Sequence, residues 1–203
     1  MSAGWPATLQ HGDVGLRPIR RGDARVWARL RQESSDWLGR WEATLPRSAP
    51  SGTRSYGAAV RSLRQQASQG RALPFVTTYG DGDEMIGQVT VSGMTWGSAR
   101  WAQIGYWIAR PYAGRGITTT AVALATDHCF EALGLHRIEI AIRPENRSSL
   151  RIVDKLGFDR VGLAPRYLHI DGAWRDHLLF AITAEQVLPG GLIARADAAG
   201  VDR

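Results

Sequence analysis

The stretch that decides the fold is residues 104–119, which read IGYWIARPYAGRGITT. Its apolar start predicts a strand that ends at Ala109, and Gly114 and Gly116 predict a tight loop that runs directly into a helix. A helix N-terminus carries unpaired amides and partial positive charge, and glycine lets the backbone approach an anion closely. The spacing differs from the GxGxxG and GxxxxGK(S/T) signatures. The loop alone therefore leaves two interpretations open, a phosphate cradle and a plain tight turn.

A second informative stretch follows one helix and one strand later, where residues 143–158 read RPENRSSLRIVDKLGF. Asn146 is a favourable N-cap, and Ser149 lies at the third position of the helix that it begins. Apolar spacing extends this helix to residue 156, and Gly157 predicts its C-terminal cap. A capped helix explains Asn146 by itself. It does not explain why this helix accompanies a loop of the phosphate-binding type.

The rest of the chain predicts one α/β (α+β) domain. The expected strands are 15–19, 73–79, 85–93, 101–109, 137–143, 160–168 and 174–182, and the expected helices begin near residue 22 and span 54–68, 118–133 and 146–156. Antiparallel strands followed by a helix–strand–helix–strand run indicate a single mixed, mostly antiparallel sheet flanked by about four helices. We expect a flexible arm at 1–12, the domain at 13–188, a loop at 45–52 and a frayed tail at 189–203.

Composition excludes several classes. The chain has 203 residues, a net charge of +6 and a single cysteine, Cys129, so it cannot form an internal disulfide. A zinc cluster and any other metal site are unsupported, and a reducing, cytoplasmic compartment fits. No signal peptide is visible, and no apolar run approaches the length of a membrane helix. The basic charge suits nucleic acid, a phosphorylated small molecule or an RNA-associated protein, and charge alone does not choose among them.

Three features together resemble the GNAT superfamily of acetyl-CoA-dependent N-acetyltransferases. They are the strand–GRGI–helix loop, the strand and cap HRIEIAIRPENRSS, and the helix end KLGF. The later segment YLHIDGAWRDHLLF resembles the RimJ/RimL branch, which acetylates the N-termini of ribosomal proteins, and the alanine-specific, RimJ-like subset in particular. The resemblance covers roughly residues 16–184. It implies a fold in which two parallel strands, here 101–109 and 137–143, splay apart around acetyl-CoA.

The resemblance also implies the contacts of acetyl-CoA. Backbone groups of residues 107–109 would pair with the pantetheine arm, and the loop amides would hold the pyrophosphate. Asn146 would bond the pantetheine or a water, and Ser149 would lie near the sulfur. The implied contacts are Trp107, Ile108, Ala109, Gly114, Arg115, Gly116, Ile117, Thr118, Thr119, Asn146 and Ser149.

The loop departs from the family pattern Q/R-x-x-G-x-G/A at its first and last positions. Ala113 replaces the first residue and Thr118 the last. Ala113 removes a side-chain contact to phosphate, which Arg110 or Arg115 is available to supply. We still expect binding, because the main-chain cradle is the larger part of the site.

Acetyl transfer requires a neutral amine, a stabilised oxyanion and a proton for the departing sulfur. An α-amine has a pKa of about 7.7–8.0, against about 10.4 for lysine, so a weak base or a water relay suffices. Some GNAT enzymes carry a glutamate where this chain has Ala141. Glu139 lies on the same strand face, about 6.6 Å away, and is a candidate base or a partner for an arginine. The candidate proton donors are Ser149, Tyr106 and Tyr112.

The acceptor is expected to meet the first half of the chain and the terminal hairpin. The candidate acceptor contacts are Asp36, Trp37, Trp41, Tyr167, Asp171 and Arg175, with Asp176 and His177 beside them. Asp176 and His177 do not form a triad, because adjacent strand residues face apart.

The leading hypothesis is an N-terminal protein acetyltransferase that uses acetyl-CoA, needs no nucleic acid or membrane, and is a monomer or a homodimer. An enzyme for a small amine, such as an antibiotic or a polyamine, is the first alternative, and a small polycation predicts a closed, acidic pocket. A CoA-sensing module without turnover is the second. A nucleic-acid-binding protein has only the basic charge in its favour.

Overall fold

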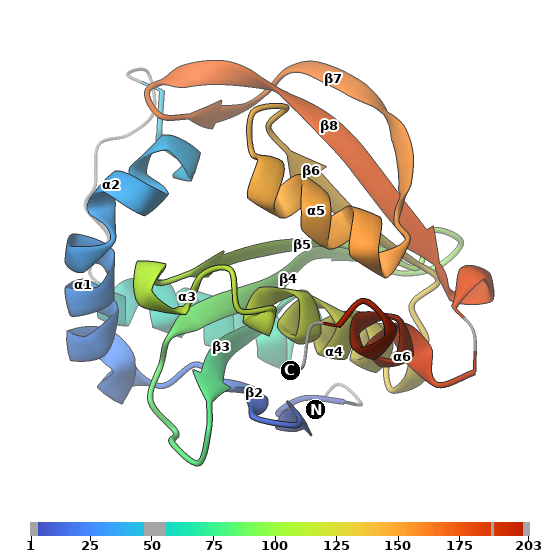
Figure 1. Cartoon of the computed structure of the whole chain (residues 1–203), viewed down its shortest axis with the longest axis horizontal. Coiled ribbons are helices and arrows are strands. Elements are labelled where there is room, and N and C mark those ends of the chain that lie inside the picture. The colour runs from blue at the N-terminus through green and yellow to red at the C-terminus, as the bar shows by residue number, and fades with distance from the viewer. Residues whose placement is uncertain (1–3, 47–55, 188, 201–203) are drawn as a thin grey trace.

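The computed structural model describes residues 4–46, 56–187 and 189–200. Its strands form one sheet in the order β1-β2-β3-β4-β5-β6-β8-β7. Figure 1 shows this sheet with β2 to β8 labelled. They are β1 (Leu9–His11), β2 (Val14–Pro18), β3 (Leu73–Tyr79), β4 (Gly87–Thr95), β5 (Trp101–Ile108), β6 (Arg137–Ile142), β7 (Asp159–Ile170) and β8 (Ala173–Thr183). The α-helices are α1 (Ala24–Glu33), α2 (Ser35–Leu38), α3 (Tyr56–Ser68), α4 (Ile117–Glu131), α5 (Arg147–Leu156) and α6 (Gly191–Ala198). The predicted α+β class and the single mixed sheet are confirmed.

The sheet is antiparallel everywhere except between β5 and β6. These two strands pair in parallel only over Trp101–Gln103 and Arg137–Glu139, and their later residues diverge. The predicted splayed pair is therefore present. Because β5 continues to Ile108 without β6 beside it, one edge of its backbone is left open to a ligand.

Alternating apolar residues place the core between the sheet and its helices. Ile138, Ile140 and Ile142 of β6 are buried, as are Val122, Ala125 and Cys129 of α4. α4 packs against β1, β2, β4 and β5 on one face of the sheet. Through this packing, the core fixes where the N-terminus of α4 points.

The two ends of the described chain are more ordered than the sequence suggests. Residues 9–11, predicted as part of a flexible arm, form β1 and pair with β2. The predicted frayed tail contains α6, and the short helix α2 was also not predicted, so the described part of the chain has six α-helices rather than about four. The Asp127 carboxylate of α4 accepts hydrogen bonds from the backbone N–H groups of Leu192 (2.8 Å) and Ile193 (3.1 Å). This cap lies on another helix, so the local Gly- and Ala-rich sequence gives no sign of it.

Most of the predicted loop at 45–52, and the start of the helix predicted at 54–68, lie outside the described residues. The domain boundaries at 12/13 and 188/189 remain predictions. Within the described part of the chain, no helix is both long and apolar enough to cross a membrane.

Candidate active site

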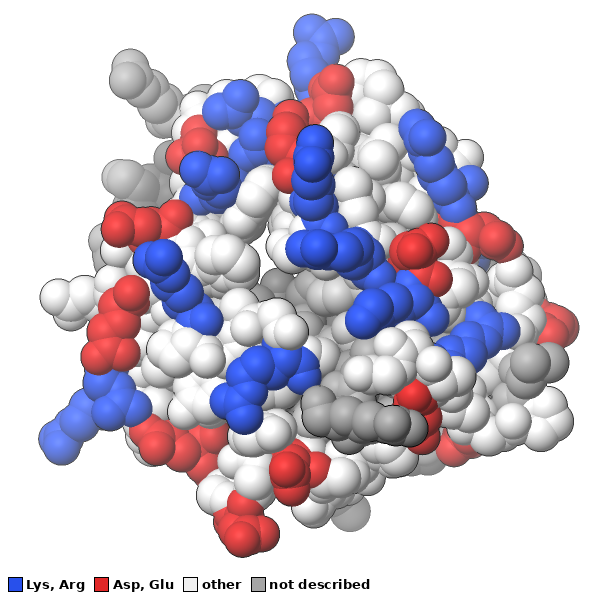
Figure 2. All heavy atoms as spheres, in the orientation of Figure 1, with Lys and Arg blue, Asp and Glu red and all other residues white. Residues whose placement is uncertain are grey.

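The separation of β5 from β6 opens a cavity of about 370 Å³. Its walls are the end of β5, the loop that leads into α4, the N-terminal turn of α4, one side of α5, and Trp37 and Trp41. In the space-filling view of Figure 2, the face that it opens on is hollowed near its centre. Lys and Arg lie around the hollow, and acidic side chains are interspersed over the rest of that face.

The N-terminus of α4 is built to hold an anion. Gly114 (φ +76°) and Gly116 (φ +81°) take left-handed conformations, which glycine adopts at little cost. The backbone N–H groups of Ile117 and Thr118, which begin the helix, find no acceptor among the described residues. Both residues line the cavity, as do Gly114, Gly116 and Thr119. The helix dipole and these free donors therefore point at the position that an anion would take.

The side-chain cations at this cavity come from α5 rather than from the loop. Arg151 and Lys155 line the cavity one turn apart, and both are exposed to solvent. Arg115 instead lies over the ring of Tyr79, 4.6 Å from its centroid, and Arg110 does not line the cavity. The positive charge that Ala113 cannot supply is thus available from α5, whereas the sequence suggested Arg110 or Arg115 of the loop.

If the cavity holds the acetyl-CoA that the family resemblance implies, replacing Arg151 with alanine should raise KM for it about 3- to 10-fold and leave kcat nearly unchanged. A charge-assisted contact to phosphate is worth about 1.5–3 kcal/mol, and exposure to solvent reduces this. Steady-state kinetics with varied acetyl-CoA would measure the change. The matched control is Arg147→Ala, which removes an exposed arginine one turn earlier on α5 that does not line the cavity. Equal effects in both variants would contradict a direct contact.

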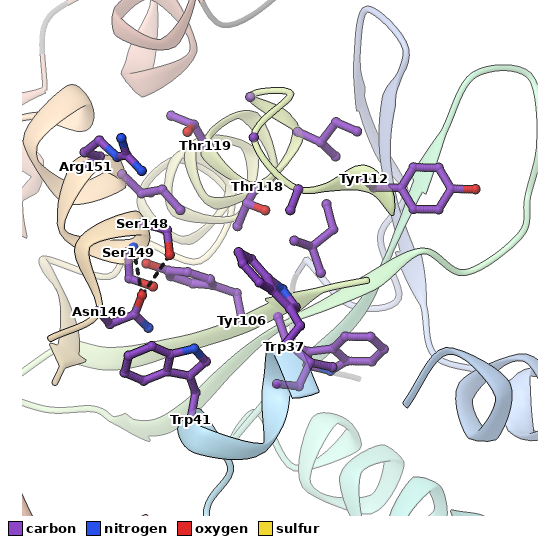
Figure 3. A pocket seen from close by; sticks show the side chains of 18 of the residues that line it. Trp37, Trp41, Tyr106, Tyr112, Thr118, Thr119, Asn146, Ser148, Ser149 and Arg151 are labelled. Carbon is purple, nitrogen blue, oxygen red and sulfur yellow. Dashed lines mark hydrogen bonds between the residues drawn. The ribbon is translucent and has the colours of Figure 1, made fainter. Parts of the chain in front are cut away.

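Asn146 both caps α5 and faces the cavity. Its Oδ1 accepts hydrogen bonds from the backbone N–H of Ser149 (3.2 Å) and from the hydroxyl of Ser148 (2.9 Å), shown as dashed lines in Figure 3. These bonds fix the orientation of the amide and leave its NH₂ group free to donate into the cavity. Asn146 and Ser149 therefore lie together at the N-terminus of α5, as the sequence predicts.

A second cavity, of about 180 Å³, lies in the gap between β5 and β6. It shares Trp41, Tyr106, Asn146 and Ser149 with the first cavity, so these four side chains surround the junction of the two. Two of the remaining lining residues, Arg143 and His177, have a charged or titratable side chain. The other seven are apolar residues or glycine: Ile104, Gly105, Ile140, Ala141, Ile142, Leu168 and Ile170.

Tyr106 is the central side chain of this junction. Its hydroxyl is buried and makes no hydrogen bond of normal geometry to a described residue. Burial raises the pKa of Tyr106 to about 12, and the nearby Ser149 hydroxyl offsets only part of the increase. The phenol is therefore a neutral proton donor at pH 7. In Figure 3 its ring extends toward Ser149, whereas the ring of Tyr112 points away from the junction.

The outer end of the second cavity is closed by the tip of the β7–β8 hairpin. Ile170 forms an isolated β-bridge with Ala43, and the backbone N–H of Asp171 donates to the carbonyl of Glu42 at 3.1 Å. Arg143 supports the same wall, since it donates to the carbonyl of Arg40 (2.8 Å) and lies over the ring of Trp41. The segment around residue 42 and the hairpin therefore form a joint wall, although more than a hundred residues separate them.

The sequence matches the acetyltransferase (GNAT) domain family over residues 13–159. It is 32% identical to the [Ribosomal protein uS5]-alanine N-acetyltransferase of Escherichia coli (strain K12) over 177 residues, 86% of this chain and 90% of that protein. This chain is a GNAT acetyltransferase. The described geometry fits such an enzyme, because a cradle of free amides leads to a junction that holds an orphaned phenol. Its acyl donor is acetyl-CoA, which delivers the acetyl group as a thioester.

Solved structures extend the comparison to almost the whole chain. The RimJ of Mycobacterium smegmatis, solved in complex with CoA-disulfide, is 45% identical, covers 98% of each chain and superposes with a TM-score of 0.90. The ribosomal-protein-S5-alanine acetyltransferase of Vibrio fischeri is 28% identical, covers 90% of this chain and 100% of its own, and has a TM-score of 0.78. The probable N-acetyltransferase YjcK of Bacillus subtilis (strain 168) is 40% identical over 100 residues, 49% of this chain and 55% of that protein. This acetyltransferase is therefore RimJ-like.

Within this GNAT fold, the expected backbone contacts lie on an edge of β5. Gly87 and Gln88 of β4 pair with Ile108 and Trp107 on one side, and the other side faces the gap. Trp107 and Ile108 line the first cavity. Ala109 is buried, and its N–H donates to the carbonyl of Ile86, so it is the one residue of this expected trio that does not line the cavity.

Several expected catalytic and acceptor residues of this acetyltransferase lie outside both cavities. The Glu139 carboxylate is held by Arg137, with Nε and Oε1 2.7 Å apart, which is the structural alternative that the sequence left open. Asp171 and Arg175 face each other on the hairpin at 4.0 Å, and the hydroxyl of Tyr167 accepts a hydrogen bond from Gln103. Asp36 also lies outside, whereas Trp37 and Trp41 line the first cavity.

Several residues that line the cavities of this acetyltransferase are not among those expected from the sequence. They include Ile104, Gly105, Ile140, Ile142, Arg143, Leu168, Ile170, Arg151 and Lys155. Arg151 and Lys155 carried a usable signal, because their spacing of four places them on one face of a helix that begins at the Asn146 cap. The apolar residues carried none, since a strand residue that lines a gap resembles one that faces the core.

Proposed function

We propose that this acetyltransferase moves the acetyl group directly from the CoA thioester to the free N-terminal α-amine of a protein, with Ala, Ser or Thr as its first residue. A ribosomal protein is the favoured acceptor. The observation that carries the proposal is the second cavity, which meets the first at Tyr106, Asn146 and Ser149. A volume of about 180 Å³ suits a small first side chain, and the apolar residues Ile104, Ala141 and Ile170 form part of its walls. Relatives named for uS5 alanine acetylation support the same acceptor.

A polyamine acceptor is the less favoured alternative. Among the described residues, neither cavity is lined by an Asp or a Glu, and the second cavity contains the Arg143 guanidinium. A polycation would gain nothing from such walls, because cations require nearby negative charge. The spermidine N(1)-acetyltransferase of E. coli (strain K12) is 32% identical over 81 residues, only 40% of this chain and 44% of that enzyme. An acceptor that is a ribosomal protein implies a cytoplasmic enzyme.

Peptides that differ only in their first residue would test the acceptor. We expect rapid acetylation of free Ala, Ser and Thr termini, and none of a blocked terminus or of an internal lysine. A Leu or Trp terminus should react at least about 10-fold more slowly, since a single excess methylene changes discrimination by about 10- to 200-fold. Acetylation of spermidine without acetylation of any peptide would contradict the proposal and show that the acceptor is a polyamine. Tight acetyl-CoA binding without any transfer would indicate a CoA-sensing module.

A further inference from the structure

A general base for the acceptor amine has to come from a small set of side chains. Within the described part of the chain, no carboxylate lines either cavity, and Glu139 is engaged by Arg137. The titratable side chains that do line the cavities are two tyrosines, three cations and one histidine. They are Tyr106, Tyr112, Arg143, Arg151, Lys155 and His177. Only the histidine has an ordinary pKa below neutrality and a neutral form that accepts a proton.

The local contacts of His177 fix its tautomer. Its Nδ1 lies 3.0 Å from the carbonyl oxygen of Arg175. A carbonyl only accepts, so Nδ1 carries the proton and Nε2 holds a lone pair. Nε2 has no hydrogen-bond partner among the described residues. The ring is 3% exposed and packs edge-on against Tyr167, with centroids 5.9 Å apart, so its orientation is set on two sides.

We propose that His177 is the general base of this enzyme, with Nε2 taking a proton from the acceptor's ammonium group in the second cavity. The freed electron pair of the amine forms the N–C bond to the acetyl carbonyl carbon, and the C–S bond breaks with its electron pair on sulfur. The nitrogen then releases its second proton to the Tyr106–Ser149 side of the junction, which replaces the proton that this side gives to the departing sulfur. The enzyme then returns the proton on Nε2 to solvent. The step rests on the proposed α-amine acceptor.

The charged surroundings keep this imidazole neutral. Burial lowers the pKa of His177 below its usual value, and the guanidinium of Arg143, which follows the neighbouring strand β6, lowers it further. The Arg175 carbonyl, Glu145 and Asp176 act in the opposite direction and do not outweigh burial. Tyr167 packs on the ring, and Asp176 is itself bound to the backbone N–H of Arg166 at 2.7 Å. Nε2 is therefore available at pH 7 and becomes blocked as the pH falls through the lowered pKa.

A weak base of this kind also matches the acceptor. About a tenth of α-amines, but fewer than about one in a thousand lysine side chains, are already neutral at pH 7. A neutral imidazole can remove a proton from an α-ammonium group far more readily than from a lysine ammonium group. His177 would thus favour a protein N-terminus over a lysine on the same protein.

His177→Asn tests the role while keeping a small polar side chain in the same position. We expect kcat on an Ala-initiated peptide to fall about 100-fold or more, with KM for acetyl-CoA unchanged, because a general base contributes about 10²- to 10⁴-fold. The rate of the variant should then follow the neutral fraction of the amine, rising about tenfold per pH unit below the amine pKa. A hydrazide-terminated acceptor, uncharged at neutral pH, should restore most of the loss. The matched control is His136→Asn, a surface histidine that pairs with Glu185.

Nitrogen NMR of His177, assigned by difference from the variant, gives a readout that does not depend on the acceptor. We expect a neutral ring at pH 7, protonated at Nδ1, with a pKa below 6.5. A ring protonated at Nε2, or charged at pH 7, would overturn the proposal even if peptides are acetylated. So would a kcat loss that the hydrazide does not restore. If no peptide is acetylated, the acceptor assignment fails while the NMR titration still decides the state of His177.

Discussion

Replacing Tyr106 with phenylalanine will lower kcat about 100-fold while leaving the protein at least as stable as the wild type. The hydroxyl is buried at the junction of the two cavities, and no described residue forms a hydrogen bond of normal geometry with it. Because burial raises the pKa of Tyr106 to about 12, the phenol stays protonated and can give a proton to the departing sulfur. Loss of a positioned proton donor costs about 10²- to 10⁴-fold in rate.

Stability should change in the opposite direction to activity. A buried hydroxyl without a partner costs about 1–3 kcal/mol, and phenylalanine removes it while keeping the ring. The unfolding midpoint should therefore stay equal or rise by a few degrees, at about 2–4 °C per kcal/mol for a chain of this size. Steady-state kinetics would measure kcat, and thermal unfolding of the same preparation would measure the unfolding midpoint. The control is Tyr56→Phe, which changes a tyrosine of α3 that lines neither cavity. A Tyr106→Phe enzyme with wild-type kcat would exclude the phenol as the donor.

Replacing Gly116 with valine will weaken acetyl-CoA binding about 10- to 100-fold. Gly116 caps α4 with φ +81°, a conformation that a β-branched residue strongly disfavours. Strain of about 1–3 kcal/mol is relieved if the loop takes another path, and the amides of Ile117 and Thr118 then no longer converge. Since about 1.4 kcal/mol is a tenfold change in affinity, calorimetric titration with acetyl-CoA will detect the loss.

A matched variant separates strain from binding. Gly80 also has a left-handed conformation, with φ +72° and open space around it, but it follows the end of β3 and lines neither cavity. Gly80→Val should lower the free energy of unfolding by a similar amount and leave acetyl-CoA affinity unchanged. If both variants bind acetyl-CoA as tightly as the wild type, the α4 N-terminus is not the anion site.

Where a signal is local, the sequence predicted the structure closely. The strand predicted at 73–79 is β3, and the helix predicted at 118–133 is α4, which spans Ile117–Glu131. Gly157 caps α5 in the left-handed conformation, and Asn146 caps its other end. These features depend on a side chain and its own backbone within a few residues, so the sequence carries them directly.

Elements that are stabilised by distant partners were missed or placed less well. α6 is capped by Asp127, which lies far away in the sequence, and β1 packs against α4 in addition to its local pairing with β2. Neither segment has strong apolar periodicity of its own. Their order comes from contacts that exist only after the sheet and α4 have formed.

The sequence by itself determined the family resemblance, the glycine turn that leads into α4 and the helix cap at Asn146, because each is a short-range backbone pattern. Only the tertiary structure decided which side chains meet. It directs Tyr106 toward the junction and Tyr112 away, it engages Glu139 with Arg137, and it brings His177 to the second cavity. The physical reason is that the cavity arises where β5 and β6 separate, and its walls come from segments more than a hundred residues apart.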